Sequence, residues 1–177
     1  MEGAWQGKDV LEPGSGDGRV TQHLARRAKS VTCVDISEKM LKLNQSKLEG
    51  HPQRNRVEYH KCFVQDFHPD RTFDVAVVSQ VLIHNVNDES FRSFVSKVAE
   101  LANVIFVFED ITQTRRTSIH TKLRKKSDII QAFSAQGCHL TKDEEHMMHE
   151  DHIALLRFSK DNDLSQVITA SAITQAD

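Results

Sequence analysis

The sequence predicts an α/β fold built on a mostly parallel sheet, and three observations lead to that class. Short β-branched runs alternate with segments of helical spacing along the 177 residues. Two of these runs, at residues 75–78 and 104–108, are continuously apolar, as expected of central strands covered on both faces. The last two runs follow one another without a helical pattern between them, which predicts an antiparallel pair at one edge of the sheet.

The expected strands and helices can be placed along the chain. Strands are expected at residues 10–11, 31–34, 57–59, 73–78, 104–108, 138–141 and 153–158. The clearest helix follows Asn87 and Asp88, which are typical N-caps, because an apolar stripe runs over residues 91–102. A further helix is expected over residues 127–136, with Gly137 ending it.

Length and composition favour one ordinary globular domain. The chain is 38% apolar and 27% charged, and we expect a domain over residues 1–159 followed by a flexible tail over residues 160–177. The net charge of −2 does not favour nucleic-acid binding through bulk charge. No apolar run is long enough to span a membrane, and three scattered cysteines without a CxxC pair indicate reduced thiols. These features predict a cytoplasmic location.

A glycine-rich loop is the strongest local signal. Residues 10–20 read Val-Leu-Glu-Pro-Gly-Ser-Gly-Asp-Gly-Arg-Val, after the first strand and before a helix with apolar positions at Val20, Leu24 and Ala28. Glycines allow positive φ and close approach of backbone N–H groups to a ligand, and a helix N-terminus favours an anion. Asp35, at the end of the second strand, is placed to accept both hydroxyls of a ribose. The loop therefore predicts a nucleotide-like ligand, with a tight strand-to-helix turn as the alternative.

The spacing of the glycines narrows the ligand class. Gly14, Gly16 and Gly18 form G-x-G-x-G, whereas a dinucleotide fingerprint requires G-x-G-x-x-G and has its last glycine where Arg19 stands. The loop lacks the lysine of a P-loop, and Ser15 lies directly between two glycines, unlike a hydrolase nucleophile. This pattern disfavours a nicotinamide oxidoreductase.

Four stretches in order resemble the class I S-adenosylmethionine-dependent methyltransferases. They are residues 12–18, residues 34–37 together with Met40, residues 65–67 and residues 73–79, within a resemblance that covers about residues 8–158. The family implies a three-layer, doubly wound, seven-stranded and mostly parallel sheet in the order 3-2-1-4-5-7-6, with the last strand antiparallel. It also implies S-adenosyl-L-methionine as cofactor, S-adenosyl-L-homocysteine as product, and methyl transfer to a small-molecule or protein amine or carboxylate by in-line displacement.

The resemblance implies which residues hold the cofactor. Glu12 would lie beneath its methionine portion and reach its ammonium group through water, and Arg19 would pair with its carboxylate. Asp35 would hold the ribose hydroxyls, and Asp66 would accept from the adenine amino group. The full implied set is Glu12, Gly14, Ser15, Gly16, Gly18, Arg19, Asp35, Ile36, Met40, Gln65, Asp66, Phe67, Ser79 and Gln80. In the same region a helix is expected from Ser37, with Met40, Leu41 and Leu48 facing inward.

Methyl transfer from a sulfonium needs alignment of two bound reactants and no metal, but an amine or hydroxyl acceptor must lose a proton. His84 and Asp110, at the ends of the fourth and fifth strands, are the candidates for this role. The alternatives are a loop histidine with a structural hydrogen bond and a carboxylate that caps the next turn. His146, His149 and His152 suggest a metal site, but their spacing turns the third residue away and we expect no metal.

A basic segment after the fifth strand suggests a further partner. It could contact an acidic substrate or an RNA backbone, or it could be a solvated helix face. Its members are Arg115, Arg116, Lys122, Arg124, Lys125 and Lys126.

Three functional readings therefore stay open. Besides methyl transfer to a small molecule or protein, they are an RNA or protein N-terminal methyltransferase and a non-catalytic S-adenosylmethionine-binding scaffold or partner subunit. Because the first strand starts near residue 8, we expect a partner or a missing segment to complete the lid over the substrate.

Overall fold

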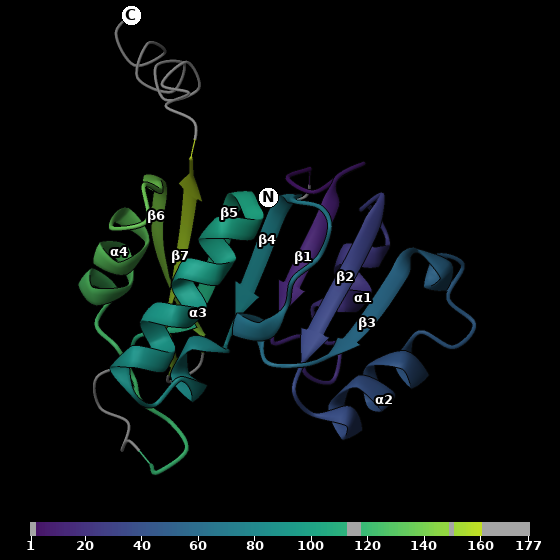
Figure 1. The fold of residues 1–177 in the computed structure, drawn as a ribbon, viewed down its shortest axis with the longest axis horizontal. Helices are drawn as coiled ribbons and strands as arrows, with labels where there is room; N and C mark the ends of the chain where they lie inside the picture. The colour runs from purple at the N-terminus through teal and green to yellow at the C-terminus, as the bar shows by residue number, and fades with distance from the viewer. Residues whose placement is uncertain (1–2, 113–117, 149–150, 161–177) are drawn as a thin grey trace, which may run out of the picture.

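A seven-stranded sheet in the order β3-β2-β1-β4-β5-β7-β6 organises the protein (Figure 1), as the resemblance to the methyltransferase family implied. The structure, a computed structural model, describes residues 3–112, 118–148 and 151–160. The strands from β3 to β5 pair in parallel, and β7 is antiparallel to both of its neighbours. The strands are β1 (Asp9–Pro13), β2 (Ser30–Asp35), β3 (Val57–Lys61), β4 (Phe73–Ser79), β5 (Ala102–Asp110), β6 (His139–Met148) and β7 (Asp151–Ser159).

Helices cover both faces of this sheet and give the predicted three layers (Figure 1). On one face, α1 and α2 pack over the β1–β3 side; on the other, α3 and α4 pack over β4, β5 and β7. The helices are α1 (Thr21–Ala25), α2 (Glu38–Lys47), α3 (Asp88–Leu101) and α4 (Lys126–Ser134), with short 3₁₀ turns η1 (Arg54–Arg56), η2 (Val64–Asp66) and η3 (Leu82–His84).

Helix α3 forms as its sequence pattern predicts. The side chain of Asn87 accepts a hydrogen bond from Ser90 N at 2.6 Å, so Asn87 is the N-cap and Asp88 the first helical residue. The apolar stripe of α3, which includes Phe91 and Phe94, is buried against the sheet. This helix lies in the connection between β4 and β5 and so determines where the loop after β4 ends.

The expectation that Met40 faces inward from α2 is wrong. Leu41 and Leu48 are buried, but Met40 is 37% exposed and Asn44 is fully buried in its place. Residues 41, 44 and 48 share one face of a helix, whereas residue 40 lies one position round from Leu41. The hydrophobicity of Met40 had suggested burial, while the helical period favours the polar Asn44.

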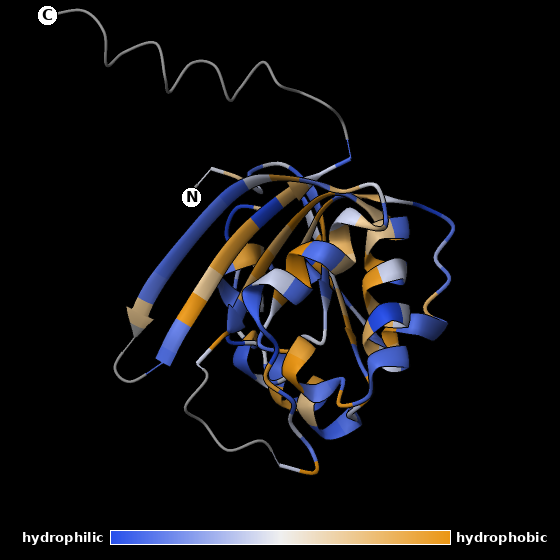
Figure 2. Cartoon of the chain, turned by 90° about the vertical axis from the view of Figure 1, so that its left-hand side faces the viewer, coloured by the Kyte–Doolittle hydropathy of each residue, from blue (hydrophilic) through white to orange (hydrophobic). Residues whose placement is uncertain are grey.

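The β6–β7 pair forms the predicted antiparallel edge of the sheet. Both strands are longer than the apolar runs at residues 138–141 and 153–158 that predicted them. Figure 2 shows hydrophobic residues along β7 and mostly hydrophilic residues along β6, the outer strand. A charged edge strand resists pairing with other chains. His146 pairs with Ile153, and His152 with Met147, so the two histidines point to opposite faces. They cannot share one metal ion, and His149 lies outside the described residues.

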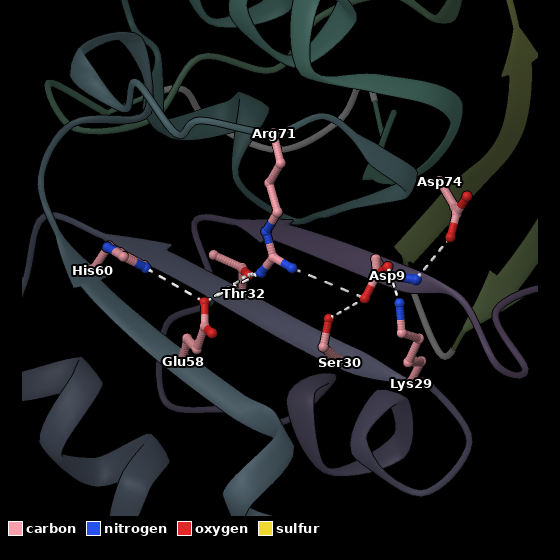
Figure 3. A network of polar contacts seen from close by, with 8 residues as sticks. All are labelled: Asp9, Lys29, Ser30, Thr32, Glu58, His60, Arg71 and Asp74. Carbon is pink, nitrogen blue, oxygen red and sulfur yellow. Dashed lines mark hydrogen bonds and ion pairs between the residues drawn. The ribbon is translucent and has the colours of Figure 1, made fainter.

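A polar network covers the β1–β3 side of the sheet face that bears α3 (Figure 3). Arg71, from the loop before β4, donates to Thr32 at 3.1 Å and pairs with Glu58 at 3.2 Å. Arg71 also lies 4.0 Å from the carboxylate of Asp9, which accepts from Lys29 at 2.8 Å. The guanidinium thus ties β1, β2 and β3 together where apolar packing ends.

The expected tail begins where the sheet ends. Strand β7 ends at Ser159, and Lys160 N still donates to the carbonyl oxygen of Asn103 at 3.0 Å. Residues 161–177 lie outside the described residues, so the expectation of a flexible tail stays a prediction.

We predict that Phe158→Ala lowers the free energy of unfolding by about 3–5 kcal/mol, because its fully buried ring stacks on Phe133 with centroids 4.7 Å apart. Denaturant unfolding measures the change. Ile119→Ala is the control, since Ile119 is 85% exposed and its loss should cost almost nothing. Equal effects for the two variants would contradict the described core.

Candidate functional site

The candidate site lies where the sheet order reverses, at the carboxyl ends of β1 and β4. Open α/β sheets bind their ligands at such a switch point. The loops after these two strands meet there: a Cβ added at Gly14 would lie 2.2 Å from Cγ2 of Val81. Beside this contact, Gln80 has a φ of +55°, which is unusual for a residue other than glycine. The two loops are therefore closely packed, and a side chain at residue 14 would separate them.

Backbone amides and one carboxylate shape the glycine loop. Gly14, Gly16 and Gly18 all have positive φ, as predicted for a loop of this kind. Gly16 N donates to Oδ2 of Asp35 at 2.8 Å, and Ser37 N donates to Oδ1 at 2.8 Å. Asp35 is thus oriented by both the loop and the start of α2, and each of its oxygens keeps a second lone pair for a ligand.

Glu12 is buried directly beneath this loop and is 3% exposed. Its Oε2 accepts from the Thr21 hydroxyl at 2.6 Å and from Cys33 Sγ at 3.5 Å. Burial raises the pKa of Glu12 to about 7, although these hydrogen bonds oppose the rise. The group therefore titrates near neutral pH and can carry a negative charge under a cationic ligand.

The residues expected on the adenine side fall into two groups. Ile36 is 51% exposed, and Asp66, the last residue of η2, is also exposed, so both are accessible. Gln65 instead donates to the Ser90 carbonyl at 3.3 Å, and the Phe67 ring packs in the core. The last two side chains are thus occupied by contacts within the protein.

The remaining predicted cofactor residues differ in how firmly they are held. The hydroxyl of Ser15 is buried in the loop and makes no hydrogen bond with residues 3–112, 118–148 and 151–160. Ser79 and Gln80 are half-buried at the end of β4. The Arg19 side chain is 80% exposed, 3.6 Å from Asp17, and stays free to swing toward a carboxylate.

The two predicted catalytic residues lie after β4 and at the end of β5. His84 is exposed on η3, and its Nδ1 lies 3.4 Å from the carbonyl oxygen of His120. Asp110 is 2% exposed at the end of β5 and accepts from Thr112 N at 2.8 Å. Asp110 thus caps the turn after β5, which was the structural alternative for it, while His84 is accessible to an acceptor.

The neighbouring Glu109 has a different environment from Asp110. Its Oε2 accepts from Leu82 N at 2.7 Å, and its buried Oε1 has no hydrogen-bond partner within the part of the chain that the structure describes. Burial raises the pKa of Glu109 to about 8, so the carboxyl is mainly protonated at neutral pH. Glu109 therefore fixes η3 to β5 as a neutral group.

The prediction for the basic segment is wrong at Arg124. This side chain is buried rather than solvated: it donates to the carbonyl oxygens of Leu82 at 3.1 Å and Asn85 at 2.6 Å, and it stacks on Phe91 at 3.9 Å. It cannot contact RNA or an acidic substrate. A sequence pattern gives no sign of this role, because the carbonyl groups that Arg124 binds lie about 40 positions earlier in the chain.

The other members of the basic segment are mostly engaged at the surface. Lys122 pairs with Asp88 at 2.6 Å, and Lys126 pairs with Asp143 at 2.9 Å and with Glu145. Lys125 is exposed. Arg115 and Arg116 lie outside the described residues. The segment therefore serves mainly to attach the chain after β5 to η3 and to β6.

Across residues 3–112, 118–148 and 151–160, no group of three His, Cys, Asp or Glu side chains is placed to hold a metal ion. Within the same ranges, no helix has the length and apolar character needed to cross a membrane.

Comparison with known proteins places these features in a family. The family model described as a methyltransferase domain matches residues 10–104, which is more than half of the chain. The mitochondrial ubiquinone biosynthesis O-methyltransferase of Bos taurus is 29% identical over 104 residues, covering 57% of this chain and 28% of that protein. The chain thus matches little more than a quarter of the length of that curated relative.

Solved structures share the fold at low identity. The magnesium protoporphyrin IX methyltransferase of Synechocystis PCC 6803 with bound SAH has a TM-score of 0.76 at 20% identity, covering 89% of this chain and 76% of that one. The [4+2]-cyclase SpnF has a TM-score of 0.74 at 15% identity, covering 88% and 76%. Since a cyclase and a methyltransferase match almost equally well, this similarity reports the fold alone.

We predict that Glu109→Gln makes stability less dependent on pH. The pKa of Glu109 is about 8 in the folded protein against 4.5 ordinarily, so the folded state holds a proton that the unfolded state has released. This group therefore makes the free energy of unfolding fall as the pH rises from about 4.5 to about 8. Glutamine keeps an oxygen for Leu82 N but does not titrate, so the slope should become less negative.

Denaturant unfolding at several pH values between about 5 and 8 measures this slope. Glu89→Gln, which changes an exposed glutamate of α3, is the matched control and should leave it unchanged. An unaltered slope in Glu109→Gln would mean that Glu109 is ionised in the folded protein.

Proposed function

The chain belongs to the methyltransferase-domain family, and on that premise we propose that it binds S-adenosyl-L-methionine and transfers its methyl group to a nucleophilic acceptor. One observation carries the proposal. At the switch point of the sheet, Gly16 N of the glycine loop donates a hydrogen bond to the Asp35 carboxylate, and Glu12 is buried beneath the same loop. A site with these two acids matches a ligand that has a ribose at one end and an ammonium group at the other.

The residues of the site fit this cofactor. The Asp35 oxygens, already oriented by backbone amides, have lone pairs left for the two ribose hydroxyls. Glu12 supplies negative charge near the ammonium group, and Ser15 offers a hydroxyl that lacks a protein partner among the described residues. Ile36 and Met40 offer exposed apolar surface beside the adenine. When bound, the cofactor supplies an electrophilic methyl group on a sulfonium.

The protein contributes alignment and control of a proton. The contact between residue 14 and Val81 holds the cofactor loop and the acceptor-side loop at a fixed separation. Such alignment of two reactants is worth up to about 7–11 kcal/mol in favourable cases. His84, exposed beside the end of β4, is the candidate to take the acceptor proton. We propose a small-molecule or protein amine or carboxylate as the acceptor.

A non-catalytic, cofactor-binding subunit is the second candidate. The observation that favours it is the engagement of Asp110, which is buried and caps the turn after β5 instead of facing an acceptor. In that case the protein binds the cofactor but transfers no methyl group by itself.

We predict that S-adenosylhomocysteine binds in calorimetric titration and that Asp35→Ala weakens binding at least about tenfold, because two charge-assisted ligand hydrogen bonds are lost. Asp70→Ala is the control: it removes an exposed carboxylate at the amino end of β4, on the opposite edge of the sheet, and should bind normally. Undiminished binding by Asp35→Ala would refute the proposed ribose site.

We predict methyl transfer from labelled S-adenosylmethionine to at least one member of a panel of amines, carboxylic acids, peptides and RNA. His84→Ala should lower kcat by about 10²-fold if His84 takes the proton. Asp110→Asn should mainly lower stability, because its capping contact weakens. Cofactor binding without transfer to any acceptor would favour the non-catalytic subunit.

A further inference from the structure

A chain of hydrogen bonds runs from the surface of β3 to the buried acid beneath the glycine loop. The Tyr59 hydroxyl donates to Oδ1 of Asn44 at 3.3 Å, and Nδ2 of Asn44 donates to Oγ1 of Thr21 at 2.8 Å. The Thr21 hydroxyl in turn donates to Oε2 of Glu12 at 2.6 Å. Tyr59 is half-buried, whereas Asn44 and Thr21 are fully buried. Four elements, β3, α2, α1 and β1, thus each contribute one member.

The donors and the distances in these hydrogen bonds indicate a direction for each proton. An amide nitrogen only donates, so the bond from Asn44 uses one of the two lone pairs of the Thr21 oxygen. The single hydroxyl proton of Thr21 is directed to Oε2 of Glu12 at 2.6 Å, because the other neighbour of this hydroxyl, Sγ of Cys33, lies 3.7 Å away. Tyr59 donates to the amide oxygen of Asn44 and so fixes which end of that amide faces Thr21. Protonation of Glu12 at Oε2 would turn the Thr21 proton away toward Cys33 Sγ, 3.7 Å distant, and so replace a short charge-assisted hydrogen bond by a weak one.

Packing holds Asn44 in this position. A Cβ added at Gly18 would lie 2.3 Å from Oδ1 of Asn44 and 3.1 Å from its Cα. The last glycine of the loop therefore lies directly against the amide, and the amide has no room to turn away. The glycine loop and the residues of the hydrogen-bond chain are thus packed against each other.

We propose that Thr21, Asn44 and Tyr59 are positioning residues whose one-way chain of hydrogen bonds keeps the Glu12 carboxylate ionised beneath the glycine loop, ready for the ammonium group of the cofactor. The inference rests on the proposed cofactor and extends it to three residues that do not touch the ligand.

Other groups around Glu12 oppose or assist this effect. Burial favours the protonated acid, and the nearby Asp35 adds like charge. Cys33 of β2 stays a thiol, because burial and the charge of Glu12 raise its pKa, and it donates weakly to Oε2. Burial likewise raises the pKa of Tyr59, so it remains a donor. Because burial already favours the protonated acid, loss of the Thr21 donor should raise the pKa of Glu12 further.

The first experiment needs no ligand. The ¹³C chemical shift of the Glu12 carboxyl, assigned by its absence in Glu12→Gln, is followed against pH in the unliganded protein. Thr21→Val keeps the shape of the side chain but removes the hydroxyl, and should raise the midpoint by about one pH unit. Asn44→Leu should also raise it, because the Thr21 hydroxyl then loses the donor that polarises it toward Glu12.

Thr32→Val is the matched control. Thr32 is a buried threonine of β2 whose hydroxyl bonds to Arg71 and not to Glu12, so its loss should leave the midpoint unchanged. If Thr21→Val does not fold, Tyr59→Phe carries the test, since it removes only the half-buried end of the chain and should shift the midpoint upward by a smaller amount. A midpoint that is unchanged in the folded variant, or that moves equally in Thr32→Val, would overturn the proposal.

The second experiment links the chain to binding. Calorimetric affinity for S-adenosylhomocysteine is measured against pH, and near pH 7 Thr21→Val should bind about five- to tenfold more weakly than the unaltered protein. The amino group of the ligand titrates identically in every variant, so only the difference between variants reports on Glu12. Equal affinities at all pH values would overturn the link to binding.

The two failures are distinguishable. If the unaltered protein does not bind the ligand at any pH, the proposed cofactor is wrong, and the ¹³C titration still tests the role of the hydrogen bonds. If the protein binds the ligand and the ¹³C midpoint is the same in all variants, the proposed cofactor is supported and the proposed role of the hydrogen bonds is wrong.

Discussion

The burial of Glu12 under the glycine loop is the constraint on which the cofactor side of the molecule depends. A carboxylate removed from water needs hydrogen-bond donors in place of its hydration. Thr21 and Cys33 supply them from α1 and β2, and Asn44 orients Thr21 from α2. Because Asn44 occupies the space beside Gly18, a larger residue there would displace the amide. One buried charge thus determines side chains on three neighbouring elements.

The loop after β4 depends on two buried charged-type side chains, one of which accepts from backbone N–H while the other donates to backbone carbonyl oxygens. Glu109 accepts the backbone N–H of Leu82, while Arg124 donates to the carbonyl oxygen of the same residue and to that of Asn85. Buried backbone groups must be satisfied. The Leu82 carbonyl also accepts from Asn85 N at 3.1 Å, whereas Leu82 N and the Asn85 carbonyl take their partners from side chains outside η3. The loop after β4, which bears His84, is therefore held by distant side chains.

Much of the fold and half of the site followed from local patterns. The alternation of strands and helices, the cap at Asn87 and the positive φ of the loop glycines each depend on neighbouring residues, which a sequence displays directly. Met40 was expected to face inward because it is apolar, yet the helical period puts Asn44 there. Arg124 was expected at the surface because it is charged, yet buried carbonyl oxygens give it partners. Both errors come from judging a side chain by its polarity without its partners.

The sequence by itself determined the fold class, the position of the glycine loop and the acid at the end of β2, because spacing and residue type encode backbone geometry locally. The tertiary structure decided which polar side chains are buried and what each of them bonds. Glu12, Asn44, Glu109 and Arg124 acquire their protonation and orientation from elements far away in the chain. Long-range burial and hydrogen-bond direction have no period in a sequence, so only the folded arrangement assigns them.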